Sequence, residues 1–413
     1  MIRRYGTLKI EGTRSVSPEY EILNSGATKT ILLIGHADID DPADYFKPFF
    51  VNDIKKALRF IKADDRLSSP LSRGLMEVFA AGALDVVLYP VAPMSEYIDS
   101  SIYRLLPNAD WGGLTFYEQY HQRLEQAYEY LRQDDRYDII VPLEAPYAFS
   151  GSVDFCTQLA DLCADCFNEN GNVVLGVMGT NSHNPNDSSD KTPYYTNDTV
   201  RHLSLDNRVA LLHDKGKFLC VVVGQGLFRH AQSSLAYTRP FDATVAGMLA
   251  NTPVDRGIAG SLFPVRMINL AHREFTSNEI DMLSLAKLNT VGKTSYSRRS
   301  RGNSQMRMLN DLTLGQDGSD YWSIAQMNLV SSMINTIRKY GLQCIGRTNG
   351  YESFQRMVAS YIDILESTNH VKAISYTIER AENDPYAAVV NLSINPIFGI
   401  KTINFTIVTT PGV

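Results

Sequence analysis

Apolar strands alternate with amphipathic helices over the first half of the chain. The expected strands are short runs rich in Val, Ile and Leu at residues 30–35, 85–91, 137–142, 172–177, 209–213 and 218–223. Between them, apolar positions recur with helical spacing at residues 52–61, 71–81, 116–132 and 153–167. This alternation predicts a largely parallel sheet with helices on its faces.

The pattern changes near Pro240. Helices are expected at residues 242–251, 278–286, 321–340 and 351–367, and Thr276 with Glu279 has the spacing of a capping box. Strands are expected at residues 288–296, 306–309, 371–379, 387–394 and 400–408. Because strands and helices are segregated here, this half is predicted to be α+β with an antiparallel sheet.

The last two expected strands alternate apolar and polar residues almost to the end of the chain. One face is formed by Val390, Leu392 and Ile394 in the first strand, and by Ile403, Phe405 and Ile407 in the second. Residues 403–410 contain neither a charge nor a proline that would discourage pairing at an edge. Either the fold covers this edge, or the strand pairs with a neighbouring molecule.

Composition narrows the class of protein. A length of 413 residues favours two or three domains. The net charge of −6 argues against nucleic-acid binding by the whole surface, which needs a cationic excess. The sequence shows neither an apolar run near the roughly 20 residues of a membrane span nor a signal-peptide core, which favours a protein made and kept in a cytoplasm.

One segment has the residue types of a metal site. The run "ILLIGHADIDD" places His36, Asp38, Asp40 and Asp41 after a predicted strand, as in many metal-dependent phosphoesterases, where carboxylates and imidazole bind two hard cations. Further ligands would have to come from other strand ends, and His213, Asp214 and Glu144 are available without a recognisable spacing. The alternative is that the aspartates cap a turn and the helix after it.

Two nucleotide-binding patterns are incomplete. The run "TVGKTS" ends like a phosphate-binding loop, but Lys287 occupies the position of its first glycine. In "VVVGQGLFRHA", Gly224 and Gly226 follow a strand, but Arg229 occupies the third glycine position. Neither pattern therefore predicts a nucleotide site.

The cysteines and one basic cluster have alternative interpretations. Cys156, Cys163 and Cys166 share a face of a predicted helix and are expected in the core, although a Cys-x-x-Cys pair can also bind metal. The run "GKTSYSRRSRGNSQMR" concentrates positive charge in Lys293, Arg298, Arg299, Arg301 and Arg307. It is either a solvated hairpin or a local patch that faces an acidic partner.

The order of motifs after Pro240 resembles that of the tail sheath proteins of contractile phages and related injection machines. That family has a proline followed by Val-Ala-Gly and then by an aspartate and an Arg-Gly pair. Here "RPFDATVAGMLANTPVDRGIAGS" supplies Pro240, Val245, Ala246, Gly247, Asp255, Arg256 and Gly257. A short helix ending in Leu288 and Asn289, two long helices and the closing strands follow in the family's order, and "LSRGLMEVFAAGALDVVLYPV" matches more weakly.

The resemblance implies a structural subunit that is not an enzyme and needs no cofactor or metal. In such sheaths, arm strands from both termini are donated to neighbouring subunits, which links hexameric rings into a helical sheath around an inner tail tube. The inter-subunit arm strands would carry Leu8 and Ile10 at one end and Ile403, Phe405 and Ile407 at the other. Arg298, Arg299 and Arg301 become candidate tube-facing residues.

The resemblance also implies further partners and a location. Besides the tube, a sheath subunit contacts baseplate and tail terminator proteins, without direct nucleic-acid contact or membrane insertion. Its place is the virion tail, assembled in the bacterial host cytoplasm, and contraction in this family needs no nucleotide.

The predicted architecture combines two parts. An α/β outer domain spans residues 28–239, and an α+β inner domain comprises an N-terminal arm at residues 1–27 and residues 240–413. The antiparallel sheet of the inner domain is expected to be completed by N- and C-terminal arm strands of neighbouring subunits. Two other functions remain open: a metal-dependent phosphoesterase using His36, Asp38 and Asp40, and a non-contractile adaptor that recruits one partner by strand addition.

Overall fold

The computed structural model describes most of the chain. The described residues are 7–10, 29–63, 69–96, 98–99, 104–105, 116–147, 153–180, 197–206, 208–229, 236–253, 257–264, 267–270, 272–294, 305–316, 323–367, 371–381, 384–396 and 403–411.

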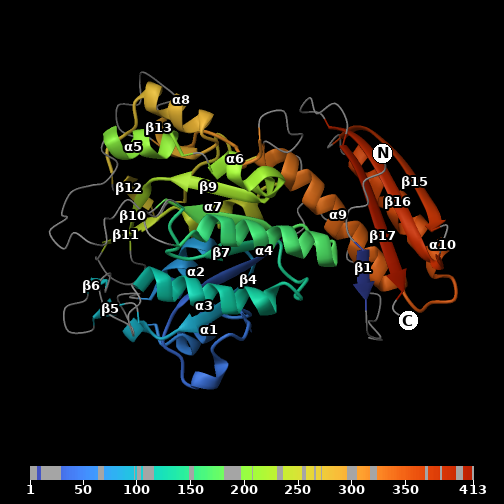
Figure 1. Ribbon diagram of the computed structural model, residues 1–413, viewed down its shortest axis with the longest axis horizontal. Coiled ribbons are helices and arrows are strands. Elements are labelled where there is room, and N and C mark those ends of the chain that lie inside the picture. Colours follow the sequence, from blue (N-terminus) through green and yellow to red (C-terminus); the bar gives the residue numbers. More distant parts are fainter. Residues whose placement is uncertain are drawn as a thin grey trace.

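An eight-stranded sheet forms the larger part of the molecule (Figure 1). In spatial order its strands are β14 (Gln305–Met308), β13 (Asn289–Thr294), β9 (Leu219–Val223), β8 (Leu175–Gly179), β7 (Ile139–Pro142), β2 (Thr30–His36), β4 (Asp85–Ala92) and β3 (Phe49–Phe50). The pairs from β13 through to β4 are parallel, and β14 and β3 add an antiparallel strand at each edge. The predicted parallel sheet is therefore confirmed.

Helices cover both faces of this sheet, because successive side chains of a strand point to opposite faces. In β2, Ile31 and Leu33 contact one core and Leu32 and Ile34 the other, and all four side chains are fully buried. The first face is covered by α1 (Ile54–Phe60), α2 (Pro70–Ala80) and α7 (Asp242–Ala250). The second is covered by α3 (Phe116–Leu131) and α4 (Phe155–Asn170).

Smaller elements surround the sheet. An antiparallel sheet has the order β11 (Ala236–Pro240), β10 (Gln225–Arg229) and β12 (Met267–Leu270), and β5 (Ile98–Asp99) pairs with β6 (Arg104–Leu105). The short helices are α5 (Asn197–Ser204), α6 (Arg208–Leu212), α8 (Ser277–Leu285) and the 3-10 turns η1 (Pro42–Asp44), η2 (Met94–Glu96) and η3 (His213–Phe218).

Two long helices lead to a separate sheet at one end of the molecule. Figure 1 shows α9 (Ile324–Cys344) running from the eight-stranded sheet towards this second sheet, where α10 (Gly350–Ser367) packs. The second sheet contains β15 (Val371–Ala381), β16 (Asp384–Pro396), β17 (Ile403–Pro411) and β1 (Thr7–Ile10). We call these four strands the terminal-strand sheet.

Most predicted elements are confirmed, and one is wrong. The capping box of Thr276 and Glu279 begins α8, and a second one, Ser323 with Gln326, begins α9. The strand predicted at residues 209–213 is helical in α6 and η3. An apolar run this short fits either element, and the Asp206 carboxylate accepts the backbone N–H of Arg208 at 2.8 Å, which favours a helix start.

The eight-stranded sheet includes segments from both halves of the chain. Strands β13 and β14 and helix α7 lie after residue 240, yet they contribute to this sheet and its core. The sheet thus crosses the boundary expected between an outer domain at 28–239 and an inner domain at 240–413. That division, with its arm at 1–27, remains a prediction.

Candidate functional site

The terminal-strand sheet joins the two ends of the chain. Its order is β1, β17, β16, β15, with β1 parallel to β17 and the other neighbours antiparallel. Leu8 lies opposite Thr409, and Ile10 lies opposite Pro411. In this structure, the predicted arm strands therefore pair with each other and with β16 of the same chain.

Strand β16 anchors this arrangement. Val390, Leu392 and Ile394 are buried, with at most 1% of each side chain exposed, which confirms the alternation predicted for this strand. The register pairs them with Ile407, Phe405 and Ile403, respectively. The backbone of β17 thus lies in the register that an alternating strand needs in order to share one apolar face with β16.

Helix α9, which leads towards the terminal-strand sheet, is fixed to the larger part of the molecule through polar contacts. The Asn335 side chain accepts the N–H of Val173 and donates to the carbonyl of Val173, both at 3.0 Å. One helical turn away, the Arg338 guanidinium donates to the carbonyl of Asn170 at 3.0 Å and pairs with Asp135. These contacts satisfy buried backbone groups next to β8 and set the position of α9.

The candidate metal ligands do not converge. His36 is buried against Tyr120, with ring centroids 4.8 Å apart, and burial lowers its pKa to about 3, the nearby charge of Arg123 acting in the same direction. The Asp38 carboxylate accepts the N–H of Met94 at 2.9 Å, and Asp40 forms an exposed ion pair with Lys62 at 3.0 Å. Asp38 and Asp40 therefore hold the loop after β2 through contacts with other parts of this chain.

The other candidate ligands do not complete a site either. Asp41 caps the turn η1 by accepting the N–H of Ala43 at 2.9 Å, as the capping interpretation expected. His213 and Asp214 lie in η3, whereas Glu144 contacts Arg239. Among the described residues, no group of three or more His, Cys, Asp and Glu side chains could hold a metal ion.

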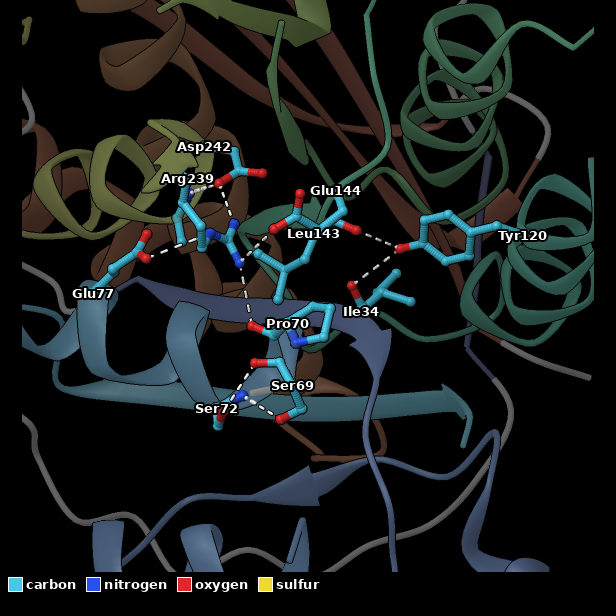
Figure 2. Close-up of polar contacts among 11 residues, drawn as sticks. Ile34, Ser69, Pro70, Ser72, Glu77, Tyr120, Leu143, Glu144, Arg239 and Asp242 are labelled. Carbon is cyan, nitrogen blue, oxygen red and sulfur yellow. Dashed lines mark hydrogen bonds and ion pairs between the residues drawn. The ribbon is translucent and has the colours of Figure 1, made fainter. Parts of the chain in front are cut away.

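A buried arginine occupies the carboxyl-terminal edge of the parallel strands, where α/β proteins usually bind ligands. Figure 2 shows the Arg239 side chain between Glu77, Glu144 and Asp242. The ion-pair distances from Arg239 are 3.4 Å to Glu77, 3.4 Å to Glu144 and 2.6 Å to Asp242, and a guanidinium nitrogen also donates to the carbonyl of Pro70 at 3.2 Å.

This arginine cluster joins four parts of the fold. Arg239 belongs to β11, Asp242 begins α7, Glu77 belongs to α2, and Glu144 follows β7. The Arg239 side chain is completely buried, so it is closed to a substrate. Tyr120 also ties this edge together, because its hydroxyl donates to the carbonyl of Leu143 at 2.7 Å (Figure 2). Local sequence patterns carry no signal for the cluster, since Glu77, Glu144 and the Arg239–Asp242 pair come from three distant segments of the chain.

The cluster contains three carboxyl groups and one guanidinium, so the repulsion among its charges depends on how many of the carboxyl groups are protonated. Burial raises the pKa of Glu77 to about 8, opposed by Arg239 and reinforced by Asp242 and Glu144. Burial raises the pKa of Glu144 as well. Near neutral pH a proton on Glu77 therefore reduces the repulsion among the carboxylates around Arg239.

The three helical cysteines belong to the core, as predicted. Cys156, Cys163 and Cys166 are all buried in α4 and form no disulfide. Burial raises the pKa of each thiol, that of Cys166 to about 12. Such thiols are protonated and are poor nucleophiles and metal ligands.

The motif residues behind the family resemblance have packing roles. A β-carbon on Gly247 would lie 2.6 Å from the carbonyl oxygen of Val78, so glycine lets α7 approach α2 closely. At Gly257 a β-carbon would meet the Asp311 carboxylate at 1.9 Å. The buried Asn289 amide donates to the carbonyls of Val221 and Leu312 at 3.0 and 2.7 Å.

The basic cluster is only partly described. Arg298, Arg299 and Arg301 lie outside the described residues. Lys293 pairs with Glu274 at 3.0 Å, and Arg307 donates to the carbonyl of Gly260 at 2.6 Å. Both described cations at the ends of the cluster thus contact this chain, and the tube-facing role of the three arginines remains a prediction.

Searches with the sequence found neither a matching family model nor a matching curated protein. Solved structures match over almost the whole chain. A sheath subunit from an extracellular contractile injection system, the PVC sheath complex in its contracted state, has a TM-score of 0.60 at 12% identity and covers 95% of this chain and 97% of its own.

Two bacterial proteins give similar matches. The sheath tail protein of Desulfitobacterium hafniense has a TM-score of 0.59 at 10% identity, with 96% of this chain and 100% of its own covered. The sheath tail protein of Listeria innocua has a TM-score of 0.59 at 12% identity, with 94% and 96% covered. The chain therefore has the fold of contractile-system sheath proteins. No helix among its described residues is long and apolar enough to cross a membrane.

Proposed function

We propose that this chain is the structural subunit of a contractile tail sheath. The observation that carries the proposal is the extent of the match, because sheath proteins share its fold over 94–96% of this chain and 96–100% of their own. The motif order after Pro240, from the Val-Ala-Gly of α7 to Asn289, supports the same assignment independently.

The subunits would assemble as stacked hexameric rings around an inner tube and contract to drive the tube through the target cell envelope. The terminal-strand sheet supplies the link between subunits. If β17 leaves β16 of its own chain and takes the same register on β16 of a neighbour, every backbone hydrogen bond is replaced by an identical one. Such an exchange is nearly neutral for one pair, and many exchanges in a lattice reinforce one another.

The N-terminal strand would take part in the same exchange. Strand β1 pairs with β17 and with no other described strand, so it can follow β17 onto a neighbouring subunit or come from a third one. Leu8, Ile10, Ile403, Phe405 and Ile407 are the residues proposed to lie at this contact. Contraction would draw on free energy stored during assembly, as the lattice moves to an arrangement with more contact between subunits.

The remaining partners follow from the same proposal. The inner tube would be gripped through the basic segment with Arg298, Arg299 and Arg301, and the ends of the sheath would contact the baseplate and the tail terminator. The particle would be assembled in the bacterial host cytoplasm as part of a virion tail or a related injection machine.

A phosphoesterase is not favoured. His36 is enclosed by the core, and the carboxylates of Asp38 and Asp40 are engaged with Met94 and Lys62. A third function, a non-contractile adaptor, would use the same strands to recruit a single partner. It predicts a monomer or small ring at every concentration, in contrast to a sheath.

Electron microscopy of the purified chain at rising concentration tests the proposal. Hollow striated cylinders are expected for the full chain, whereas the chain without residues 403–413 should stay folded and fail to polymerise. Removing only Gly412 and Val413 is the matched control and should leave cylinders intact. A full chain that remains a monodisperse monomer at every concentration would overturn the proposal.

A further inference from the structure

Strand β15 lies at one edge of the terminal-strand sheet. Among the described residues, β16 is the only strand that pairs with it. Its register with β16 is regular from Ile374 to Arg380. This stretch is rich in β-branched and aromatic residues and contains no proline. A long, regular edge of this kind is a template on which another copy of the chain can add a strand.

Two side chains of α10 bind the outer edge of β15. The Glu366 carboxylate accepts the backbone N–H of Ile374 at 2.9 Å, and the Tyr351 hydroxyl donates to the carbonyl of Ile378 at 3.0 Å. In an antiparallel strand, alternate residues turn both main-chain groups to the same side. Ile374, Tyr376 and Ile378 therefore share the side of β15 that faces away from β16.

Tyr351 is held in place by two neighbours. The Gln355 amide donates to the Tyr351 hydroxyl at 3.1 Å, and the Arg380 guanidinium lies over the tyrosine ring, 4.7 Å from its centroid. The helix that carries both side chains is itself anchored, because Phe354, Val358 and Leu365 of α10 are buried in the core. The contacts to the edge thus come from a rigid element.

We propose that α10 closes the β15 edge through Tyr351 and Glu366. Other copies of this chain can then add strands to the terminal-strand sheet only on the side of β16 that faces away from β15. The inference rests on the proposed strand exchange for its biological meaning. A sheet with two open edges would accept a strand from a neighbouring subunit on either side. Closing one edge leaves each subunit with a single edge that can accept such a strand. Tyr351 and Glu366 are positioning residues in this scheme, since they select the edge used without belonging to the exchanged strands.

The double variant Tyr351→Phe with Glu366→Ala opens the edge in the full-length chain. Its matched control is Tyr340→Phe with Glu352→Ala, which makes the same chemical changes on α9 and on the exposed side of α10. Sedimentation velocity over a dilution series gives the concentration at which each protein begins to self-associate. Circular dichroism and thermal unfolding check that each variant is folded.

The double variant is expected to self-associate at about a tenfold lower concentration than the wild type or the control, since two edge bonds no longer compete with an incoming strand. Adding Tyr376→Pro should restore the wild-type onset. Proline there removes only an outward N–H and leaves the pairing with β16 intact. Equal onset for the double variant and the control, or an association that Tyr376→Pro does not reverse, would overturn the proposal.

Two further variants keep the test decisive. If the double variant fails to fold, Tyr351→Phe alone removes a single oxygen atom and should show a smaller shift in the same direction. If the proline variant fails to fold, Tyr376→Lys places a charge at the edge instead. The assay detects self-association through the β15 edge whether or not cylinders form. Failure of the edge proposal and failure of the sheath proposal are therefore distinguishable.

Discussion

The carboxylate of Asp138 accepts a hydrogen bond from the side-chain amide of Asn335 at 3.0 Å, across 197 residues of sequence. The same carboxylate accepts the N–H of Thr30 at 3.0 Å, where β2 begins. Asp138 therefore joins the first residue of β2, in the eight-stranded sheet, to α9, the helix that leads to the terminal-strand sheet.

Replacing Asn335 with alanine should destabilise the protein by about 2–4 kcal/mol, because the buried N–H and carbonyl of Val173 would both lose their partner. Urea unfolding of dilute, unassembled protein measures the change. Ser332→Ala, half-buried on the same helix, is the control and should have little effect. An Asn335→Ala midpoint equal to that of the control would show that water replaces these bonds without loss.

Glu77 should make stability fall as pH rises. Its ordinary pKa is 4.5, and burial raises it to about 8 in the fold, so folding takes up a proton between these values. The stabilising effect of the neutral carboxyl is complete below about pH 4.5 and is lost as pH approaches about 8. Glu77→Gln keeps the neutral form at every pH and should remove this slope.

The measurement compares unfolding free energies of Glu77→Gln and wild type at several pH values. The difference should change in favour of the variant by a few kcal/mol, on the order of 2–5, between acidic and mildly alkaline pH. Glu352→Gln, an exposed change on α10, should show a constant difference. A pH-independent difference for Glu77→Gln would mean that Glu77 is already ionised beside Arg239.

Gly247→Ala should separate α7 from α2. In an unconstrained helix interior this change stabilises by about 1 kcal/mol. Here the added β-carbon would lie 2.6 Å from the carbonyl oxygen of Val78 and 2.7 Å from the β-carbon of Ala81, so we expect a loss of about 1–3 kcal/mol in urea unfolding.

Gly35→Ala is the control for this substitution. An added β-carbon there has ordinary contacts at 3.5 Å with Leu143 and Pro70, so a much smaller change in unfolding free energy is expected. Stabilisation by Gly247→Ala would show that the two helices can move apart without cost, and would remove the packing explanation of the Val-Ala-Gly motif.

The features of the fold that depend on local sequence patterns could be predicted from the sequence. Continuous apolar runs identify the parallel strands, and the Thr276 capping box identifies the start of α8, because both signals depend on residues close together in the chain. The Arg239 cluster and the Asn335 contacts were not predicted, since each depends on partners that only the finished fold brings together. Asn289 appeared as part of a motif, but its three bonds to the backbones of Val221 and Leu312 carry no local signal.

The terminal strands show a different limit of sequence analysis. Alternation at residues 403–407 predicts a strand and its pairing face, but it is the same whether the acceptor is β16 of the same chain or of a neighbour. The structure places β17 on its own β16, with Phe405 opposite Leu392. An exchanged strand would have an identical local environment, so the choice depends on concentration and assembly.

A disulfide can distinguish pairing within one chain from pairing between subunits. The register places Asn391 opposite Thr406, and the five native cysteines are buried and unpaired, so Asn391→Cys with Thr406→Cys adds one reactive pair. In dilute protein, oxidation should give monomers on a non-reducing gel. In cylinders formed before oxidation, it should give covalent ladders, because each β17 would lie on the β16 of another subunit. Cylinders that yield only monomers would refute strand exchange at β17 and leave the sheath function standing.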